Sequence, residues 1–461
     1  MSAPTNTARR IFLGLLLAAA AGAALAAPSH SPSPSPRPNP DGPDALTLVA
    51  EAELPGTIAW IIIDLDTGEA LEGGNVDEPL PPASVAKAPT AVFALAALGP
   101  DHRFETRLVA SGVLEDGVLT GDLILQGGGD PETDTESLDL LTFHAAEAGL
   151  KRVDGRFLVD DALLPAIEQI DATQPEIAAY NPAVAGINLN YNRVFAEWGR
   201  TGGRMEMKVE ARARGASPAT GAIQVEIAEA VTDGAFDYLG GDDRENWRVA
   251  RKALGEKGGR WLPVRRPAAY AGDVMRTLAA RAGFELPAVE PGPAPMMANV
   301  LARVESRPLA DILTDMLTYS TNLTAEAVGV AAARALGGAP ATLGASAAAM
   351  NDWVAEFAGF PPGDAGFQLV NHSGLSPDSR VSVRRFAEFL LAAERRGFPA
   401  LDGGRAAKLK GLMPQRNFLD EGTTPPPVAA SLRAKTGTLN FVSALAGYIE
   451  PEHGRRFAFA I

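Results

Sequence analysis

The chain has 461 residues, of which 46% are hydrophobic, and a formal net charge of −15. This length predicts two or three domains with sizeable cores. An acidic surface repels phosphate backbones, so the charge argues against nucleic acid as a partner. The sequence has no cysteine, which excludes disulfides and thiol catalysis.

The N-terminus carries an export signal. Arg9 and Arg10 precede an apolar run, residues 11–25, that ends in a small-x-small cleavage site. We interpret residues 1–26 as a secretory signal peptide, with a partial likeness to twin-arginine signals. The Pro- and Ser-rich residues 27–45 predict an extended linker. We therefore expect an exported, periplasmic protein, with no transmembrane span in the mature chain.

The remaining elements follow in chain order. A hairpin is expected over 57–71, with its first strand buried on both faces. Short strands and glycine turns then predict one or two β-rich modules. The turn 127–131 lacks the spacing of a phosphate loop, so it predicts no cofactor site. Apolar periodicity and caps predict helices over 309–317, 325–336, 343–358, 382–396 and 404–413, followed by strands over 431–438, 441–448 and 456–461.

The first chemical candidate is the pair Ser84 and Lys87, which lies at a predicted helix start. Residues three apart share a helix face, so the lysine can reach the serine. A serine hydroxyl needs an adjacent base, and a desolvated lysine beside another cation can serve as one. Alone this pair is weak evidence, because most such pairs are surface residues.

Two further stretches bear on Ser84. Ser320-Thr321-Asn322 lies between two predicted helices, where an ordinary helix cap is the simpler explanation. Lys435-Thr436-Gly437-Thr438 lies on a predicted strand, where a lysine guarding an exposed edge is the simpler explanation. In this order, however, Ser-x-x-Lys, Ser-x-Asn and Lys-Thr-Gly resemble the motifs of penicillin-binding proteins and serine β-lactamases.

The resemblance narrows to one family. Lys87 and Ser320 are 233 positions apart (320 − 87), and a large insert at this point is typical of the class C, D-alanyl-D-alanine carboxypeptidase/endopeptidase type, peptidase family S13. The stretches 121–131, 189–192, 373–376 and 434–439 also resemble that family. The resemblance implies an α/β fold with a transpeptidase-like catalytic domain: an antiparallel sheet flanked by helices. That domain would comprise 46–103 and 300–461, with a β-rich insert at 104–299.

The resemblance also implies roles for the site residues. Ser84 would be the nucleophile, Lys87 the general base, and Lys435 a positive field that attracts a substrate carboxylate. Ser320 would relay a proton, and Asn322 would bind the substrate amide and position Lys87. Thr436, Gly437 and Thr438 would bind substrate, with the N–H groups of Ser84 and Thr438 facing the oxyanion.

The implied substrates are peptidoglycan stem peptides and cross-links, and a β-lactam would bind covalently. We expect no metal and no organic cofactor. The five histidines show no ligand spacing and lend no support to a Ser-His-Asp triad. Asp160, which follows a predicted strand, is a candidate contact for the cationic end of a stem peptide; a solvated acidic turn is an equal alternative.

Three other functions stay open on the sequence: a β-lactamase-like hydrolase, a catalytically silent wall-binding or sensor protein, and a purely structural periplasmic protein. The oligomeric state is open too. The chain departs from the family at Pro89, inside the nucleophile helix, and at His372, where glycine is usual. The family continues with a terminal helix, so we expect a C-terminally truncated chain whose last strand, 456–461, lies against 57–63.

Overall fold

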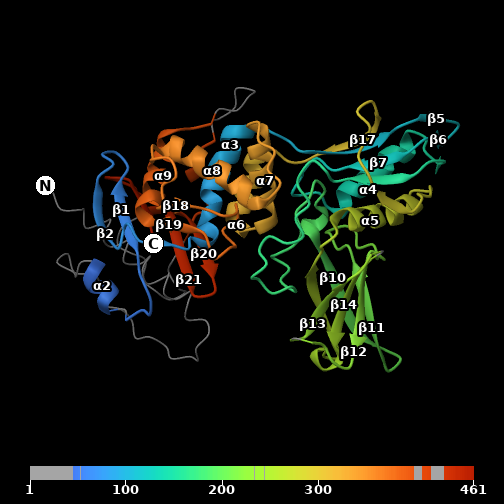
Figure 1. Cartoon of the computed structure of the whole chain (residues 1–461), viewed down its shortest axis with the longest axis horizontal. Coiled ribbons are helices and arrows are strands. Elements are labelled where there is room, and N and C mark those ends of the chain that lie inside the picture. Colours follow the sequence, from blue (N-terminus) through green and yellow to red (C-terminus); the bar gives the residue numbers. More distant parts are fainter. Residues whose placement is uncertain (1–44, 52, 233, 243, 399–406, 417–429) are drawn as a thin grey trace.

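The computed structural model describes residues 45–461, apart from positions 52, 233, 243, 399–406 and 417–429. The predicted signal peptide and all but the end of the predicted linker lie outside the described residues, as do positions 404–406 of one predicted helix. Figure 1 shows a helix-rich body that combines the early and late parts of the chain, and a strand-rich body built from the middle. We call them the catalytic body and the insert.

A five-stranded antiparallel sheet runs through the catalytic body in the order β2-β1-β22-β21-β20. Strand β1 (Trp60–Asp64) is buried along its whole length, as its Trp-Ile-Ile-Ile run predicts. It pairs with both β2 (Ala70–Gly74) and β22 (Phe457–Ala460), so the hairpin and the pairing of the last strand with the first are confirmed. Strands β21 (Val442–Pro451) and β20 (Ala430–Leu439) complete the sheet.

The helices of this body largely match the predicted ones. They are α3 (Lys87–Leu98), α6 (Leu309–Tyr319), α7 (Asn322–Ala335), α8 (Leu343–Ala358) and α9 (Val383–Arg395), with the short α2 (Ala45–Glu51) before the sheet. The helix predicted over 404–413 is confirmed only over 409–412 in its described part. Ala407 pairs with Phe398 in an isolated β-bridge, which leaves a single turn, α10 (Leu409–Leu412).

Helix α3 is the centre of the catalytic body. Its residues from Lys87 to Leu95 are all buried, and it packs against α6, α7 and α8. A helix that is apolar on every side needs cover all round, which this position provides. Pro89 lies in the first turn, where a helix has no partner for its N–H groups, so this departure from the family is easily accommodated.

The insert contains three larger sheets. One has the order β16-β9-β7-β4-β17, and the two others are β11-β10-β15 and β12-β14-β13. The strands of the first are β4 (Glu105–Ala110), β7 (Leu123–Gln126), β9 (Phe157–Asp160), β16 (Val289–Pro291) and β17 (Asn299–Glu305), and its helices are α4 (Thr135–Glu147) and α5 (Pro267–Arg281). The others comprise β10 (Arg193–Thr201), β11 (Arg204–Glu210), β12 (Ile223–Ala228), β13 (Phe236–Gly240), β14 (Glu245–Ala250) and β15 (Lys257–Pro263).

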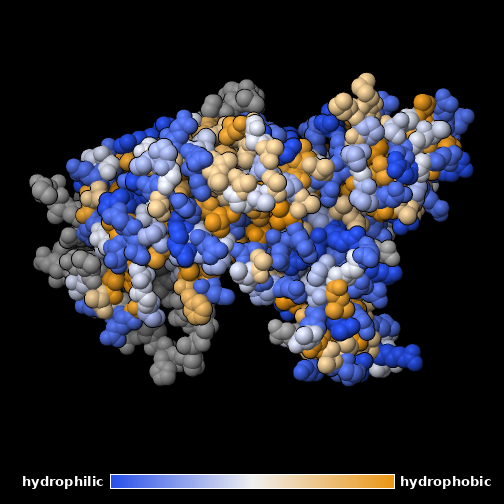
Figure 2. Space-filling view, in the orientation of Figure 1, coloured by the Kyte–Doolittle hydropathy of each residue, from blue (hydrophilic) through white to orange (hydrophobic). Residues whose placement is uncertain are grey.

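The remaining elements are short, and their strands form two small sheets, β18-β19-β3 and β5-β6-β8. These elements are β3 (Pro79–Leu80), β18 (Phe367–Gln368) and β19 (Arg380–Ser382) in the catalytic body, and β5 (Val113–Glu115), β6 (Val118–Thr120), β8 (Arg152–Val153), η2 (Leu189–Asn192) and η3 (Arg251–Ala253) in the insert. Figure 2 shows an open notch between the two bodies in its lower half. Within the described residues, no helix combines the length and apolar character needed to cross a membrane.

Each body has its own main hydrophobic core. One joins residues from Ile61–Phe104 with residues from Leu309–Ala460, and the other lies wholly between Leu108 and Ala302. Strand β17 pairs with β4 of the insert along its length. We therefore propose that the insert extends to Glu305, six residues beyond the boundary that the sequence suggested.

Candidate active site

Ser84 lies in a 3₁₀ turn, η1 (Ala83–Ala86), that runs directly into α3. The predicted helix start is thus a tighter turn followed by an α-helix. The preceding residue, Ala83, is fully buried and has a φ of 49°. Alanine rarely adopts this left-handed conformation, so the backbone at the serine is held there by its surroundings.

Lys87 is fully buried, and its amine contacts three groups. The Nζ atom lies 3.0 Å from Ser84 Oγ, 2.7 Å from Asn322 Oδ1 and 2.8 Å from the carbonyl oxygen of Ser373. Burial and the nearby charge of Lys435 lower the pKa of Lys87 well below its usual value, although Glu326 acts in the opposite direction. Such a lysine can hold a lone pair ready to accept a proton.

Ser320 and Asn322 lie where α6 ends and α7 begins. Ser320 caps α6 with a φ of 60°, and this left-handed residue turns the chain so that α7 starts at Asn322. The Nδ2 atom of Asn322 donates to the carbonyl oxygen of Tyr180, at 2.9 Å, from a loop of the insert. A carbonyl can only accept, so Tyr180 fixes which end of the amide faces Lys87.

Lys435 lies on β20 and is 1% exposed, which contradicts the simpler interpretation of an exposed edge lysine. Its Nζ atom donates to Ser320 Oγ at 3.0 Å and to the carbonyl oxygen of Thr436 at 2.8 Å. Burial, with a smaller contribution from Arg416, lowers the pKa of Lys435 to about 7. The structure therefore brings the three predicted motifs together around Ser84.

Strand β20 also carries the predicted substrate-binding residues alongside the serine turn. A Cβ atom on Gly437 would lie 2.9 Å from the Pro82 carbonyl oxygen and 3.0 Å from the Ser84 nitrogen. Glycine is what lets the strand pass this closely. Thr436 is half-buried and Thr438 is exposed. Their contacts with substrate stay a prediction.

Asp160 is placed differently from the other predicted site residues. Its carboxylate accepts hydrogen bonds from Gln126 Nε2 (3.1 Å) and from the N–H groups of Ala294 (3.0 Å) and Ala162 (3.2 Å). All these partners belong to the insert, and the described residues show no bond between Asp160 and the three motifs. The carboxylate thus holds a loop of the insert, and its contact with substrate stays untested.

Sequence reasoning missed two residues that complete the site. One is Tyr180, through its carbonyl. The other is Glu326 on α7, whose carboxylate accepts the N–H groups of His372 (3.0 Å) and Ser373 (2.8 Å). Glu326 follows Asn322 by four positions, so helix spacing alone places both on one face. No comparable local signal marked Tyr180.

His372 is a core residue. Its Nε2 atom lies 2.8 Å from Ser346 Oγ, its ring stacks on Phe93, and burial lowers its pKa to about 3. The ring occupies the space beside Gly329, where an added Cβ would lie 2.2 Å from it. Glycine at position 329, on the neighbouring helix, therefore makes room for the histidine ring.

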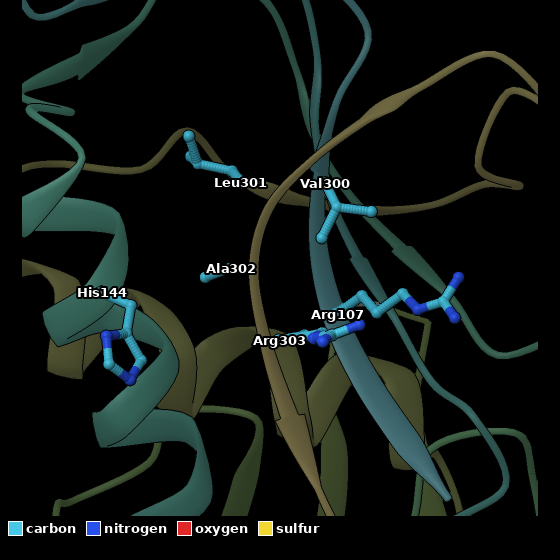
Figure 3. A pocket seen from close by; sticks show the side chains of 6 residues that line it. All are labelled: Arg107, His144, Val300, Leu301, Ala302 and Arg303. Carbon is cyan, nitrogen blue, oxygen red and sulfur yellow. The ribbon is translucent and has the colours of Figure 1, made fainter.

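Another surface depression, of about 630 Å³, lies in the insert beside β17 (Figure 3). In this view Val300 and Arg107 lie on one side of that strand, and Leu301 and His144 on the other, so the side chains do not converge. Arg107 and Arg303 both pair with Glu105. The depression contains no nucleophile. Among the described residues, no cluster of His, Asp and Glu has the composition of a metal site.

Comparisons with known proteins agree with this arrangement. The family model described as the D-Ala-D-Ala carboxypeptidase 3 (S13) family matches residues 46–461. A carboxypeptidase of Mycobacterium tuberculosis is 30% identical over 90% of this chain and 78% of its own length. The D-alanyl-D-alanine carboxypeptidase of an Actinomadura species is 27% identical over 91% of this chain and 80% of its own.

A solved structure shares the fold. Penicillin-binding protein 4 of Haemophilus influenzae superposes with a TM-score of 0.74 at 24% identity, covering 90% of this chain and 92% of the other. The likeness confirms the predicted transpeptidase-like architecture of a helix-flanked sheet with a large insert. The family match covers both bodies and all three motifs. The chain belongs to the D-Ala-D-Ala carboxypeptidase 3 (S13) family.

Proposed function

We propose that the chain is a serine-type D-alanyl-D-alanine carboxypeptidase and endopeptidase that acts on peptidoglycan through an acyl-Ser84 intermediate. One observation carries the proposal: the 3.0 Å contact between Ser84 Oγ and the amine of Lys87, whose pKa is lowered by burial. Membership of the S13 family supports the reaction class, hydrolysis of a D-Ala-D-Ala peptide bond.

Acylation begins with attack by Ser84 Oγ on the carbonyl carbon of the penultimate D-alanine. Lys87 Nζ accepts the hydroxyl proton as the oxygen–carbon bond forms. The negative charge moves to the carbonyl oxygen, which the N–H groups of Ser84 and Thr438 stabilise. Loss of one such donor typically costs about 10²–10³-fold in rate.

Collapse of the tetrahedral intermediate breaks the carbon–nitrogen bond. The departing amine needs a proton, and we assign Ser320 to relay to it the proton that Lys87 has taken from Ser84. Lys435 Nζ donates to Ser320 Oγ and so holds this hydroxyl in place. The terminal D-alanine, or the next stem peptide in a cross-link, then leaves. Water attacks the acyl carbon, Lys87 again accepts a proton, and Ser84 regains its hydroxyl as the ester bond breaks.

Recognition uses the charge of the substrate. Lys435 attracts the terminal carboxylate, and the hydroxyls of Thr436 and Thr438 donate hydrogen bonds that orient it. Asp160 remains a candidate contact for the cationic end of the stem peptide; unchanged activity of Asp160→Asn on meso-diaminopimelate peptides would remove it from the site. We further propose that the chain is exported and works in the periplasm, and that β-lactams acylate it in place of the peptide.

The deciding experiment is intact mass after incubation with a penicillin. We expect one persistent adduct on the wild-type chain and none on Ser84→Ala. An adduct that survives in Ser84→Ala would refute the assignment of the nucleophile. Rapid turnover of the penicillin, with no persistent adduct, would favour a β-lactamase-like hydrolase instead.

A further inference from the structure

The surroundings of Lys87 determine where its lone pair points. A neutral amine has two N–H donors and one lone pair, and this amine has three neighbours. Asn322 Oδ1 and the Ser373 carbonyl oxygen can only accept, so they take the two N–H donors. The lone pair is then left for the hydroxyl of Ser84. Its direction depends on how firmly these two oxygens are held.

The two oxygens have different supports. Asn322 is held by the Tyr180 carbonyl, as described above. Ser373 is held by Glu326, which accepts the N–H groups of both Ser373 and His372. On the other side of this segment, Thr90 Oγ1 donates to the His372 carbonyl oxygen at 2.7 Å. The segment that presents the Ser373 carbonyl is therefore fixed from α7 and from α3.

Glu326 is fully buried, and its surroundings are those of a carboxylate. One oxygen accepts from His372 and the other from Ser373, and hydrogen bonds from two N–H donors favour the ionised form of the group. Burial raises the pKa of Glu326, and these hydrogen bonds and the charge of Lys87 oppose that change. The charged groups that face Glu326 are Lys87 and, on the far side of Lys87, Lys435. His372 is neutral, because burial lowers its pKa to about 3.

We propose that Glu326 is a positioning residue for acyl transfer, which fixes the Ser373 carbonyl and thereby aims the lone pair of Lys87 at Ser84. The inference rests on the proposed function, in which Lys87 is the base. Glu326 acts on Lys87 through the Ser373 peptide and through its negative charge. A buried carboxylate is costly unless it is well bonded, and here its bonds support the lysine that the reaction uses.

Two substitutions separate these effects. Glu326→Gln removes the charge and turns one acceptor into a donor that faces an N–H group. We expect the first-order rate of acylation by penicillin to fall about 100-fold, because small misplacements of reacting groups have effects of this size. The affinity of the initial non-covalent complex should not change. Loss of the negative charge also lowers the pKa of Lys87, so the acid limb of the rate–pH profile should move to lower pH.

Glu326→Asp keeps the charge but shortens the side chain. We expect a slower acylation with the acid limb where the wild type has it. Glu394→Gln is the matched control, since Glu394 is a buried carboxylate of the same body whose partners are Lys410 and Arg456. This control should lose stability while keeping the wild-type acylation rate and acid limb.

The outcomes are distinguishable. Wild-type rate and acid limb in folded Glu326→Gln would overturn the inference while leaving the proposed function intact. If Glu326→Gln does not fold, the aspartate variant decides, and a wild-type rate in it would overturn the inference. A wild-type chain that forms no adduct at Ser84 would instead refute the proposed function.

Discussion

The two bodies both bury ionisable groups, and they do so in opposite ways. In the insert, the Glu245 carboxylate accepts the N–H groups of Arg265 and Arg266. The Arg265 guanidinium in turn donates to the carbonyl oxygens of Glu168, Glu176 and Asn181. The charge of Arg265 acts on Glu245 through space and lowers its pKa, but burial is the larger effect and raises that pKa to about 7.

The catalytic body instead buries two like charges near one another. Lys87 and Lys435 are bonded to hydroxyl and carbonyl oxygens, and the carboxylate nearest to Lys87 is committed to backbone N–H groups. Like-charge proximity and burial both lower the pKa of a lysine, which prepares Lys87 for proton transfer. The comparison teaches that burial alone does not mark a reactive site; the sign of the neighbouring charge, like for Lys87 and opposite for Arg265, makes the difference.

The strongest test of this contrast is Lys87→Ala. We expect acylation by penicillin to fall by about 10²–10⁴-fold, the usual contribution of a general base, with a near-normal melting temperature. Rapid-quench mass spectrometry measures the rate. Lys410→Ala, which removes a lysine paired with Glu394 and Glu450, is the control and should acylate normally. Near-normal acylation of Lys87→Ala would assign the base to another group.

Arg265→Met tests the opposite side of the comparison. It removes a positive charge that acts on the buried Glu245 and the guanidinium donor of three carbonyl oxygens, so we expect a loss of about 3–5 kcal/mol in unfolding free energy. Acylation in the molecules that remain folded should fall far less than in Lys87→Ala. Urea unfolding measures the unfolding free energy. Arg266→Met removes a half-buried side chain whose guanidinium contacts the carbonyl oxygen of Gly241 in a surface loop, and should cost under about 1 kcal/mol. Equal losses in both variants would contradict the contrast.

Lys435 sharpens the comparison through pH. Its pKa of about 7 means that it carries its charge below that pH and loses it as the pH rises. Capture of substrates with a free carboxylate, measured as kcat/KM, should therefore decline through about pH 7. Lys435→Ala should be roughly 100-fold weaker below that pH, comparable to the loss of one electrostatic donor, and should lack the decline. A decline that persists in Lys435→Ala would belong to a different group.

The smallest effect concerns His372, the neutral member of the catalytic body. Gly329→Ala places a methyl group against its ring, and overpacking of this kind costs about 1–3 kcal/mol. Thermal unfolding measures the cost. The same change in a His372→Gly background should cost almost no stability, because the ring that the methyl group would meet is absent. Equal costs in both backgrounds would show that the contact does not limit stability.

The sequence was informative where the signal is local or where spacing is distinctive. The buried strand Trp60–Asp64, the pairing of the last strand with the first, and the contact of Lys87 with Ser84 all agree with the expectations. The role of Tyr180 could not be predicted from the sequence, because it contacts Asn322 across 142 positions and uses a backbone carbonyl that any residue carries. Glu326 was missed because a glutamate on a helix ordinarily faces solvent.

The left-handed Ala83 has a consequence for the start of the reaction. A Cβ atom on Gly374 would lie 2.0 Å from the Ala83 carbonyl oxygen, so the late chain is packed directly onto the residue before the nucleophile. The conformation costs roughly 1–2 kcal/mol for a residue other than glycine. That cost is part of the free energy of folding, because residues late in the chain hold the turn in this conformation in the native state. The serine is therefore preorganised before any peptide arrives, and substrate binding energy need not be spent on shaping the nucleophile.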